Sequence, residues 1–154
     1  MKFVTDSVEE TYALGERLAR ALAPGDVLAL RGDLGAGKTS FVRGLARGLR
    51  VPSEYPVTSP TFVLLQTYPG AVNLHHLDFY RIENASELAS LGLTEWLGSD
   101  GVVAIEWFEK FPSVWTGDTI EISLTIDSEN RRTLEVGETS PRSRAVVAAL
   151  QGAS

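Results

Sequence analysis

Along this chain the spacing of hydrophobic and polar residues changes from segment to segment, and these changes predict alternating helices and strands. A capping box begins at Ser7, and the apolar residues after it share one helical face until Pro24-Gly25 ends the helix. Residues 27–30 form a short continuous apolar run, which is typical of a strand buried on both faces. The glycine-rich loop that follows opens a second helix, over about residues 38–49.

The middle of the chain predicts an irregular connection followed by a pair of strands. Residues 51–60 are rich in Pro, Ser and Thr, which favours an irregular segment flexible enough to respond to a ligand. Residues 62–68 and 72–79 have the pattern of consecutive strands, with Pro69-Gly70 as the turn between them. We therefore expect a hairpin here.

The C-terminal half predicts further strands and a mixed sheet. Residues 101–107 contain a nearly unbroken apolar run, which indicates a central strand. Residues 120–127 alternate between apolar and polar, so this strand has one wet face, and it should pair antiparallel with residues 133–136. A short helix beginning at Ser86 and a closing helix over residues 143–150 complete the pattern. The order predicts an α/β fold flanked by helices, whose mixed sheet is parallel at its centre and ends in an antiparallel C-terminal edge hairpin.

Length and composition indicate an ordinary globular chain. The 154 residues are enough for one domain, residues 1–154, and the apolar (44%) and charged (22%) fractions lie near globular averages. No apolar run is long enough to span a bilayer and the N-terminus is acidic, so we expect a cytoplasmic protein. The absence of cysteine excludes disulfides, thiolate metal sites and a cysteine nucleophile. A net charge of −6 argues against an independent nucleic-acid binder.

The loop between the first predicted strand and the second predicted helix carries the strongest chemical signal. Residues 32–39 match G-x-x-x-x-G-K-[ST], the P-loop, whose backbone N–H groups and helix N-terminus bind phosphate. Lys38 is expected to reach the β and γ phosphates of a nucleotide, and the Thr39 hydroxyl to bind Mg²⁺. The alternative is a glycine turn that only joins strand to helix. The predicted nucleotide-binding residues here are Asp33, Leu34, Gly35, Ala36, Gly37, Lys38, Thr39 and Ser40.

A P-loop also needs a carboxylate at the end of a neighbouring strand to hold the metal, and two are available. Asp78 and Glu106 each follow an apolar run, at the edge where an open α/β sheet binds its ligands. We predict that Lys38, Asp78 and Glu106 are catalytic, and that Thr39, Asp78 and Glu106 bind the metal. Glu106 is the first choice to orient the attacking water, and the two carboxylates can exchange roles. The alternative for each is a carboxylate that caps a strand end in solvent.

Several other residues have two interpretations each. His75 and His76 are adjacent, so they point to opposite faces of a strand, which favours a structural or supporting role over a metal site. Trp107 can stack on a base or a partner, or simply fill a gap.

Two groups of residues outside the P-loop also have a local and a functional interpretation each. The hydroxyl residues Thr58, Ser59 and Thr61 can act as a nucleotide-sensing switch or cap a turn locally. A basic stripe, Arg43, Arg47 and Arg50, is either a solvated face or a docking surface for an acidic partner or RNA phosphates.

Four ordered segments of this sequence resemble the TsaE (YjeE) family of bacterial ATPases. They are the P-loop at residues 32–39, Ser-Pro-Thr at 59–61, His-Leu-Asp-Phe-Tyr-Arg at 76–81 and Ile-Glu-Trp at 105–107. The resemblance implies ATP hydrolysis, with Mg²⁺, in service of a TsaD- and TsaB-type complex that attaches threonylcarbamoyl to adenosine 37 of tRNA. It also implies that Trp107 and Arg132 lie near the nucleotide, and that tRNA is contacted only through the complex.

The sequence leaves two other functions open. Guanine-specific signatures are absent, and no Arg-rich lid segment suggests a small-molecule kinase, so hydrolysis ranks above transfer to a metabolite. A metabolite kinase and a nucleotide-dependent binding module remain the alternatives. Activity without partners is expected to be weak, as it is for a GTPase that receives an arginine in trans.

Overall fold

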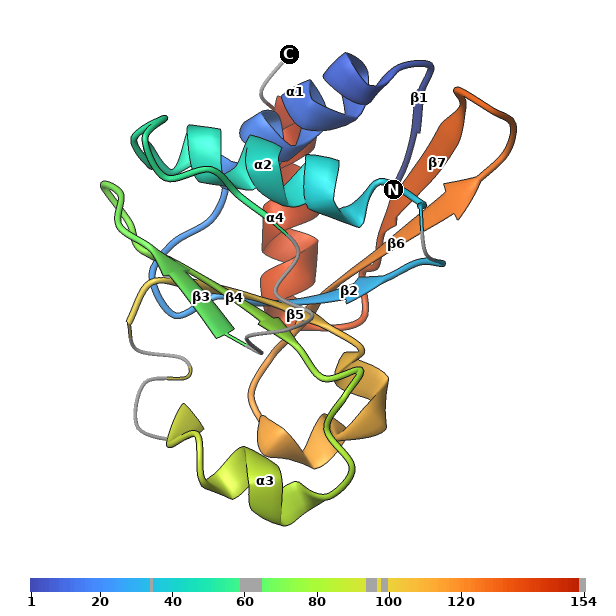
Figure 1. Ribbon diagram of the computed structural model, residues 1–154. Coiled ribbons are helices and arrows are strands. Elements are labelled where there is room, and N and C mark those ends of the chain that lie inside the picture. Colours follow the sequence, from blue (N-terminus) through green and yellow to red (C-terminus); the bar gives the residue numbers. More distant parts are fainter. Residues whose placement is uncertain (34, 59–64, 94–96, 98–99, 153–154) are drawn as a thin grey trace.

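The chain folds into a seven-stranded mixed sheet with helices on both faces (Figure 1). This computed structural model describes residues 1–33, 35–58, 65–93, 97 and 100–152. The strands are β1 (Lys2–Thr5), β2 (Val27–Arg31), β3 (Leu65–Tyr68), β4 (Leu74–Asp78), β5 (Val102–Glu106), β6 (Ile120–Ile126) and β7 (Arg132–Val136). The helices are α1 (Val8–Ala19), α2 (Lys38–Gly48), α3 (Ala85–Ala89) and α4 (Pro141–Gly152), with 3-10 turns η2 (Phe108–Lys110) and η3 (Pro112–Val114).

The centre of the sheet is parallel, as the sequence predicts. The strand order is β1-β7-β6-β2-β5-β4-β3, in which β2 pairs parallel with both β5 and β6, and β5 pairs parallel with β4. The hairpins β3–β4 and β6–β7 are antiparallel, which confirms both predicted pairings. The carboxyl ends of β2, β4 and β5 therefore meet at one edge of the sheet, and the functional residues at those ends come together.

The sequence patterns do not predict β1, which forms one edge of the sheet. β1 pairs antiparallel with β7, so the β6–β7 hairpin lies one strand in from the edge. Only four residues long, β1 is too short to show a clear alternation, and its Val4 is 57% exposed. Of the predicted strand 62–68, residues 65–68 form β3, whereas residues 62–64 lie outside the described part of the chain.

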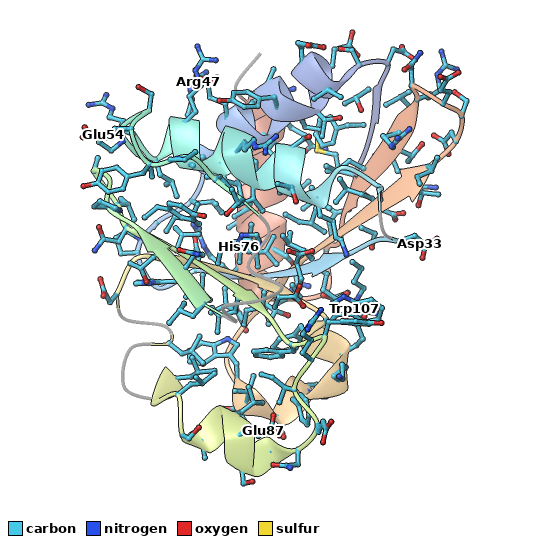
Figure 2. All side chains as sticks on the ribbon, viewed as in Figure 1. Asp33, Arg47, Glu54, His76, Glu87 and Trp107 are labelled. Carbon is cyan, nitrogen blue, oxygen red and sulfur yellow. The ribbon has the colours of Figure 1, made fainter. Side chains whose placement is uncertain are left out.

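Two hydrophobic clusters lie on opposite faces of the sheet. The first joins α1, α2 and α4 to alternate sheet residues such as Leu28, Leu30 and Ala104. The second joins α3 and η2 to the sheet residues that point to the opposite face, such as Ala29 of β2 and Ile105 of β5. In Figure 2, Arg47 on α2 and Glu87 on α3 point outward on opposite sides, and His76 lies in the interior. Among the described helices, none has the length and apolar composition needed to cross a bilayer.

A glycine contact fixes the helix that follows the P-loop. Gly15 of α1 and Gly44 of α2 lie where the two helices approach most closely: a Cβ on Gly15 would collide with the Phe41 carbonyl oxygen, and one on Gly44 with that of Tyr12. No larger residue fits at either position without separating the helices. The contact sets the distance of α2 from α1, and with it the placement of Lys38 at the start of α2.

Candidate nucleotide-binding site

The P-loop connects the end of β2 to the start of α2, as the motif predicts. Gly35 and Gly37 have φ angles of +83° and +100°, in the left-handed region that glycine adopts without strain. Gly37 is the N-cap of α2 and brings no side chain to bond the amides of the first turn. These amides and the helix dipole remain available to an anion. Leu34, also predicted to bind nucleotide, lies outside the described residues.

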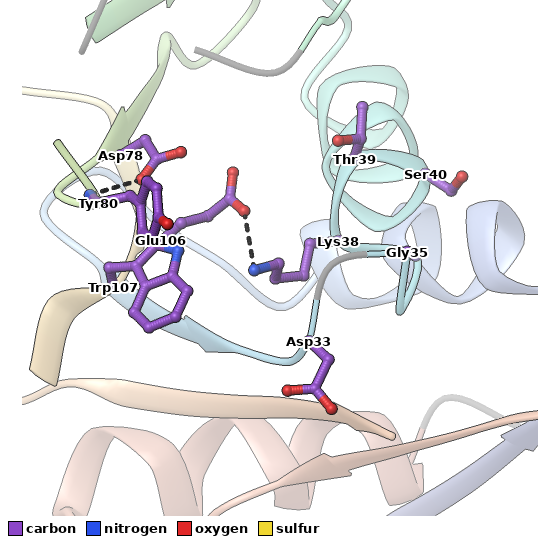
Figure 3. A pocket seen from close by; sticks show the side chains of 10 residues that line it. Asp33, Gly35, Lys38, Thr39, Ser40, Asp78, Tyr80, Glu106 and Trp107 are labelled. Carbon is purple, nitrogen blue, oxygen red and sulfur yellow. Dashed lines mark hydrogen bonds and ion pairs between the residues drawn. The ribbon is translucent and has the colours of Figure 1, made fainter. Parts of the chain in front are cut away.

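A cavity of about 740 Å³ opens beside this loop (Figure 3). Its walls come from the P-loop and from the carboxyl ends of β4 and β5. The lining residues are Asp33, Gly35, Gly37, Lys38, Thr39, Ser40, Asp78, Tyr80, Glu106 and Trp107. The fold therefore brings to one cavity most residues that the sequence proposes for the site. Of the others, Ala36 is fully buried and belongs to the first hydrophobic cluster.

Glu106, the last residue of β5, faces Lys38 across this cavity. The Lys38 Nζ lies 3.3 Å from Glu106 Oε1, and the Nε2 of His76 lies 2.8 Å from Glu106 Oε2. Burial alone raises the pKa of the Glu106 carboxyl. The hydrogen bond and charge of His76, followed by the charge and hydrogen bond of Lys38, outweigh burial, so the pKa stays below its usual value and the group is ionised.

Asp78 occupies the matching position at the end of β4. It pairs in register with Glu106, and its Oδ1 accepts a hydrogen bond of 2.8 Å from the Tyr80 amide, which fixes the carboxylate at the strand end. Both carboxylates are buried, so the alternative of solvent-exposed strand caps does not apply.

The oxygen atoms in this cavity suit a hard divalent cation such as Mg²⁺. Thr39 contributes a hydroxyl, and Asp78 and Glu106 contribute carboxylates. Mg²⁺ is commonly held by one or two carboxylates, with water and phosphate oxygens completing its six ligands. Within the described residues, no group of three His, Cys, Asp or Glu side chains is placed to bind a metal by itself. The donor set therefore fits a magnesium ion that arrives with a phosphorylated ligand.

An aromatic pair forms one wall of the cavity. Trp107 has a φ of +61°, a left-handed conformation that is uncommon for a non-glycine residue and is often found at functional sites. Its ring centroid lies 5.2 Å from that of Tyr80 and 5.6 Å from Lys38 Nζ. The Lys38 ammonium group therefore lies close to the Trp107 ring within the cavity. Tyr80, which is 56% exposed, was not identified from the sequence, although it lies two residues after Asp78 in the quoted 76–81 segment.

Comparison with known proteins assigns the chain to a family. A family model described as "Threonylcarbamoyl adenosine biosynthesis protein TsaE" matches residues 5–134. The chain belongs to the TsaE family. The resemblance inferred from the four sequence segments is thereby confirmed.

Relatives and one solved structure agree with this assignment. The tRNA threonylcarbamoyladenosine biosynthesis protein TsaE of Treponema pallidum (strain Nichols) is 39% identical over 136 residues, covering 88% of this chain and 99% of the relative. The protein of the same name from Bacillus subtilis (strain 168) is 45% identical over 133 residues, covering 86% and 82%. A crystal structure of Bacillus subtilis YdiB matches with a TM-score of 0.81 at 30% identity, covering 99% of this chain and 94% of that one.

Arg132 of this TsaE-family chain lies beside the P-loop but does not line the cavity. Its guanidinium donates to three carbonyl oxygens of the β6–β7 turn, and its NH2 group lies 3.4 Å from the Gly35 carbonyl oxygen. The side chain therefore joins the β6–β7 turn to the P-loop backbone. A direct contact between Arg132 and a nucleotide stays a prediction.

The two histidines lie on opposite faces of β4, as their adjacency predicts. His75 Nδ1 forms a 3.0 Å hydrogen bond with the Thr67 hydroxyl, and its Nε2 lies 3.5 Å from an Asp100 carboxylate oxygen. His76 instead contacts Glu106 on the cavity side. Of the two histidines, His76 is therefore the one that contacts a residue of the cavity.

The three arginines of the predicted basic stripe do not all lie on α2. Arg43 donates to the Val57 carbonyl oxygen at 3.0 Å, and Arg47 lies 3.6 Å from a Glu16 carboxylate oxygen. Arg50 lies beyond the end of α2 at Gly48, and its φ of +62° takes it out of the helical repeat. Arg43 and Arg47 therefore lie on α2, whereas Arg50, which follows the C-cap Leu49 in a left-handed conformation, does not continue their stripe.

The proposed switch residues are only partly described. The Thr58 amide donates to the Tyr68 hydroxyl at 3.3 Å, so this residue is tied to β3. Ser59 and Thr61 lie outside the described residues.

Proposed function

We propose that this chain binds ATP together with Mg²⁺ at the P-loop and hydrolyses the γ-phosphate. The observation that carries the proposal is the 3.3 Å approach of Lys38 and Glu106 across the cavity at the carboxyl edge of the parallel strands. A phosphate-binding lysine, an ionised carboxylate and free helix N-terminal amides are the parts that phosphoryl transfer needs. Thr39 and Asp78 line the same cavity and complete the proposed oxygen ligands of the metal.

The side chains have separate tasks in this mechanism. Lys38 leaves Glu106 when the nucleotide enters, and its ammonium group then balances the charge of the β and γ phosphates. The Glu106 carboxylate is thereby released to orient a water molecule toward the γ-phosphate. Thr39, Asp78 and Glu106 are the candidate ligands of Mg²⁺, which supplies further neutralisation of phosphate charge when it is bound.

We infer that this hydrolysis serves the threonylcarbamoyladenosine modification of tRNA, with TsaD- and TsaB-type proteins as partners. Support comes from membership of the TsaE family and from the names of its relatives. A net charge of −6 makes direct tRNA binding unfavourable, so tRNA is reached through the complex. Such an ATPase works in the cytoplasm and is weakly active without its partners.

Phosphate release from ATP, measured with and without TsaD- and TsaB-type proteins, tests this function. Release that depends on Mg²⁺ and rises with the partners is the expected result. Transfer of radiolabelled phosphate to a metabolite would instead support a small-molecule kinase. Tight ATP binding with no hydrolysis in either condition would support a nucleotide-dependent binding module.

A further inference from the structure

His76 lies directly behind the carboxylate that the proposed mechanism uses. Its side chain is fully buried on β4, and its Nε2 is 2.8 Å from Glu106 Oε2. In the sheet register His76 is opposite Ala104, and Glu106 follows two residues later on the same face of β5. Because Ala104 has only a methyl group, the imidazole has room to reach diagonally along β5 to the carboxylate.

The chemistry of the two groups assigns the direction of this hydrogen bond. The Lys38 ammonium lies 3.3 Å from Glu106 Oε1, as it would from a carboxylate, and a carboxylate can only accept, so His76 donates through Nε2 to Oε2. His76 Nδ1 is buried and has no hydrogen-bond partner among the described residues.

We propose that His76 is a positioning residue that keeps the Glu106 carboxylate in its orientation after Lys38 has moved to the nucleotide. The two carboxylate oxygens have different partners: Lys38 holds Oε1 and His76 holds Oε2. When Lys38 turns to the phosphates, Oε1 is released to the cavity while Oε2 stays bound. The inference rests on the proposed function, because it concerns the step for which Glu106 must be oriented.

Because His76 is buried, its hydrogen bond to Glu106 Oε2 is not readily replaced by one from a water molecule. With His76 fully buried, a leucine in its place would set an apolar side chain against Oε2 instead of a donor. Glu106 would then lose both of its side-chain partners once the nucleotide is bound, and its carboxylate would be held less firmly. Loss of a group that orients a reacting carboxylate should lower turnover with little effect on ATP binding.

The first experiment compares three variants in partner-stimulated phosphate release and in calorimetric ATP binding. His76→Leu removes the donor at similar volume and should lower kcat by about 10- to 100-fold with ATP affinity unchanged. His76→Gln should recover most of the activity, because its amide nitrogen donates from nearly the position of Nε2. His75→Leu is the matched control on the opposite face of β4, and it should retain wild-type kcat. Wild-type kcat in folded His76→Leu, or equal losses in both leucine variants, would overturn the proposal.

A double-mutant cycle then tests whether His76 acts through Glu106. In a Glu106→Gln background, His76→Leu should cause no further loss of kcat, whereas the same fold loss in both backgrounds would contradict the proposal.

A nucleotide-free measurement separates this inference from the proposed function. Nuclear magnetic resonance of the imidazole nitrogens should show a proton on His76 Nε2 whose signal shifts in Glu106→Gln. A ring protonated on Nδ1 instead would overturn the inference. Failure of the wild-type chain to hydrolyse ATP in any condition would reject the proposed function and leave the ring measurement interpretable.

Discussion

The two faces of the β4–β5 strand pair are built from alternate residues of the same two strands, yet they differ at the carboxyl ends of these strands. On one face His76, Asp78 and Glu106 gather beneath the start of α2. On the other, Leu77 and Ile105 pack into the cluster that joins α3 to the sheet. A period of two residues lets one strand support a hydrophobic core and a polar site at the same time. Substitutions on the two faces should therefore affect different properties, and this separation can be tested.

The largest effect is expected at Glu106. Glu106→Gln keeps the size and most of the hydrogen-bonding capacity of the side chain but removes its charge. Turnover should fall by about 10²- to 10⁴-fold, the usual contribution of a group that moves or orients a proton. ATP affinity should be retained, and calorimetry combined with phosphate release measures both. Partner-stimulated turnover near the wild-type rate would exclude Glu106 from the role proposed for it.

Ile105 is the neighbour of Glu106 on the other face, so it gives the complementary test. Ile105→Ala leaves a cavity in the second hydrophobic cluster and should lower the free energy of unfolding by about 2–5 kcal/mol, measured by urea denaturation. At a temperature where the variant is folded, its ATP affinity should match that of the wild type. A large loss of affinity in folded protein would mean that the two faces are not independent.

Asp78 should show an intermediate effect that is specific for the metal. Asp78→Asn keeps an oxygen that accepts from the Tyr80 amide but loses the negative charge. We expect the Mg²⁺ concentration needed for half-maximal activity to rise by about tenfold, equivalent to about 1.4 kcal/mol. A magnesium titration after removal of metal with a chelator measures this change. An unaltered requirement would leave Thr39 and Glu106 as the ligands to test.

Thr67 should give the smallest effect, since it supports only the histidine on the face away from the cavity. Thr67→Val removes the hydroxyl that bonds His75 and should cost about 0.5–1.5 kcal/mol of stability. Phosphate release by the folded variant should be unchanged. A marked loss of turnover would show that His75 influences the site through β4.

The sequence was sufficient for the elements that have a local signal. The P-loop motif, the apolar runs before Asp78 and Glu106 and the alternation in β6 each depend only on neighbouring residues. The structure brings the P-loop, Asp78 and Glu106 to one cavity. The fold class was predicted correctly for the same reason. Each of these features can be located from the sequence because the residues that define it are neighbours in the chain.

Features that depend on pairing between distant segments could not be obtained in this way. β1 is stabilised by β7, more than a hundred residues later, and its four residues carry no pattern of their own. The His76–Glu106 hydrogen bond joins residues thirty positions apart and needs the register of β4 on β5. The left-handed conformation of Arg50, which removes this residue from the basic stripe, also has no signal in the sequence.

Calorimetric titration of ATP with Mg²⁺ into the wild-type chain and into Lys38→Ala tests the central claim most directly. Lys38 supplies the charge for the β and γ phosphates in this account, and it makes no contribution to either hydrophobic cluster. Saturable binding by the wild type and its loss in a variant that is still folded by circular dichroism is the result that we predict. Equal affinity in the two proteins would show that the nucleotide does not bind at the P-loop and would contradict the account.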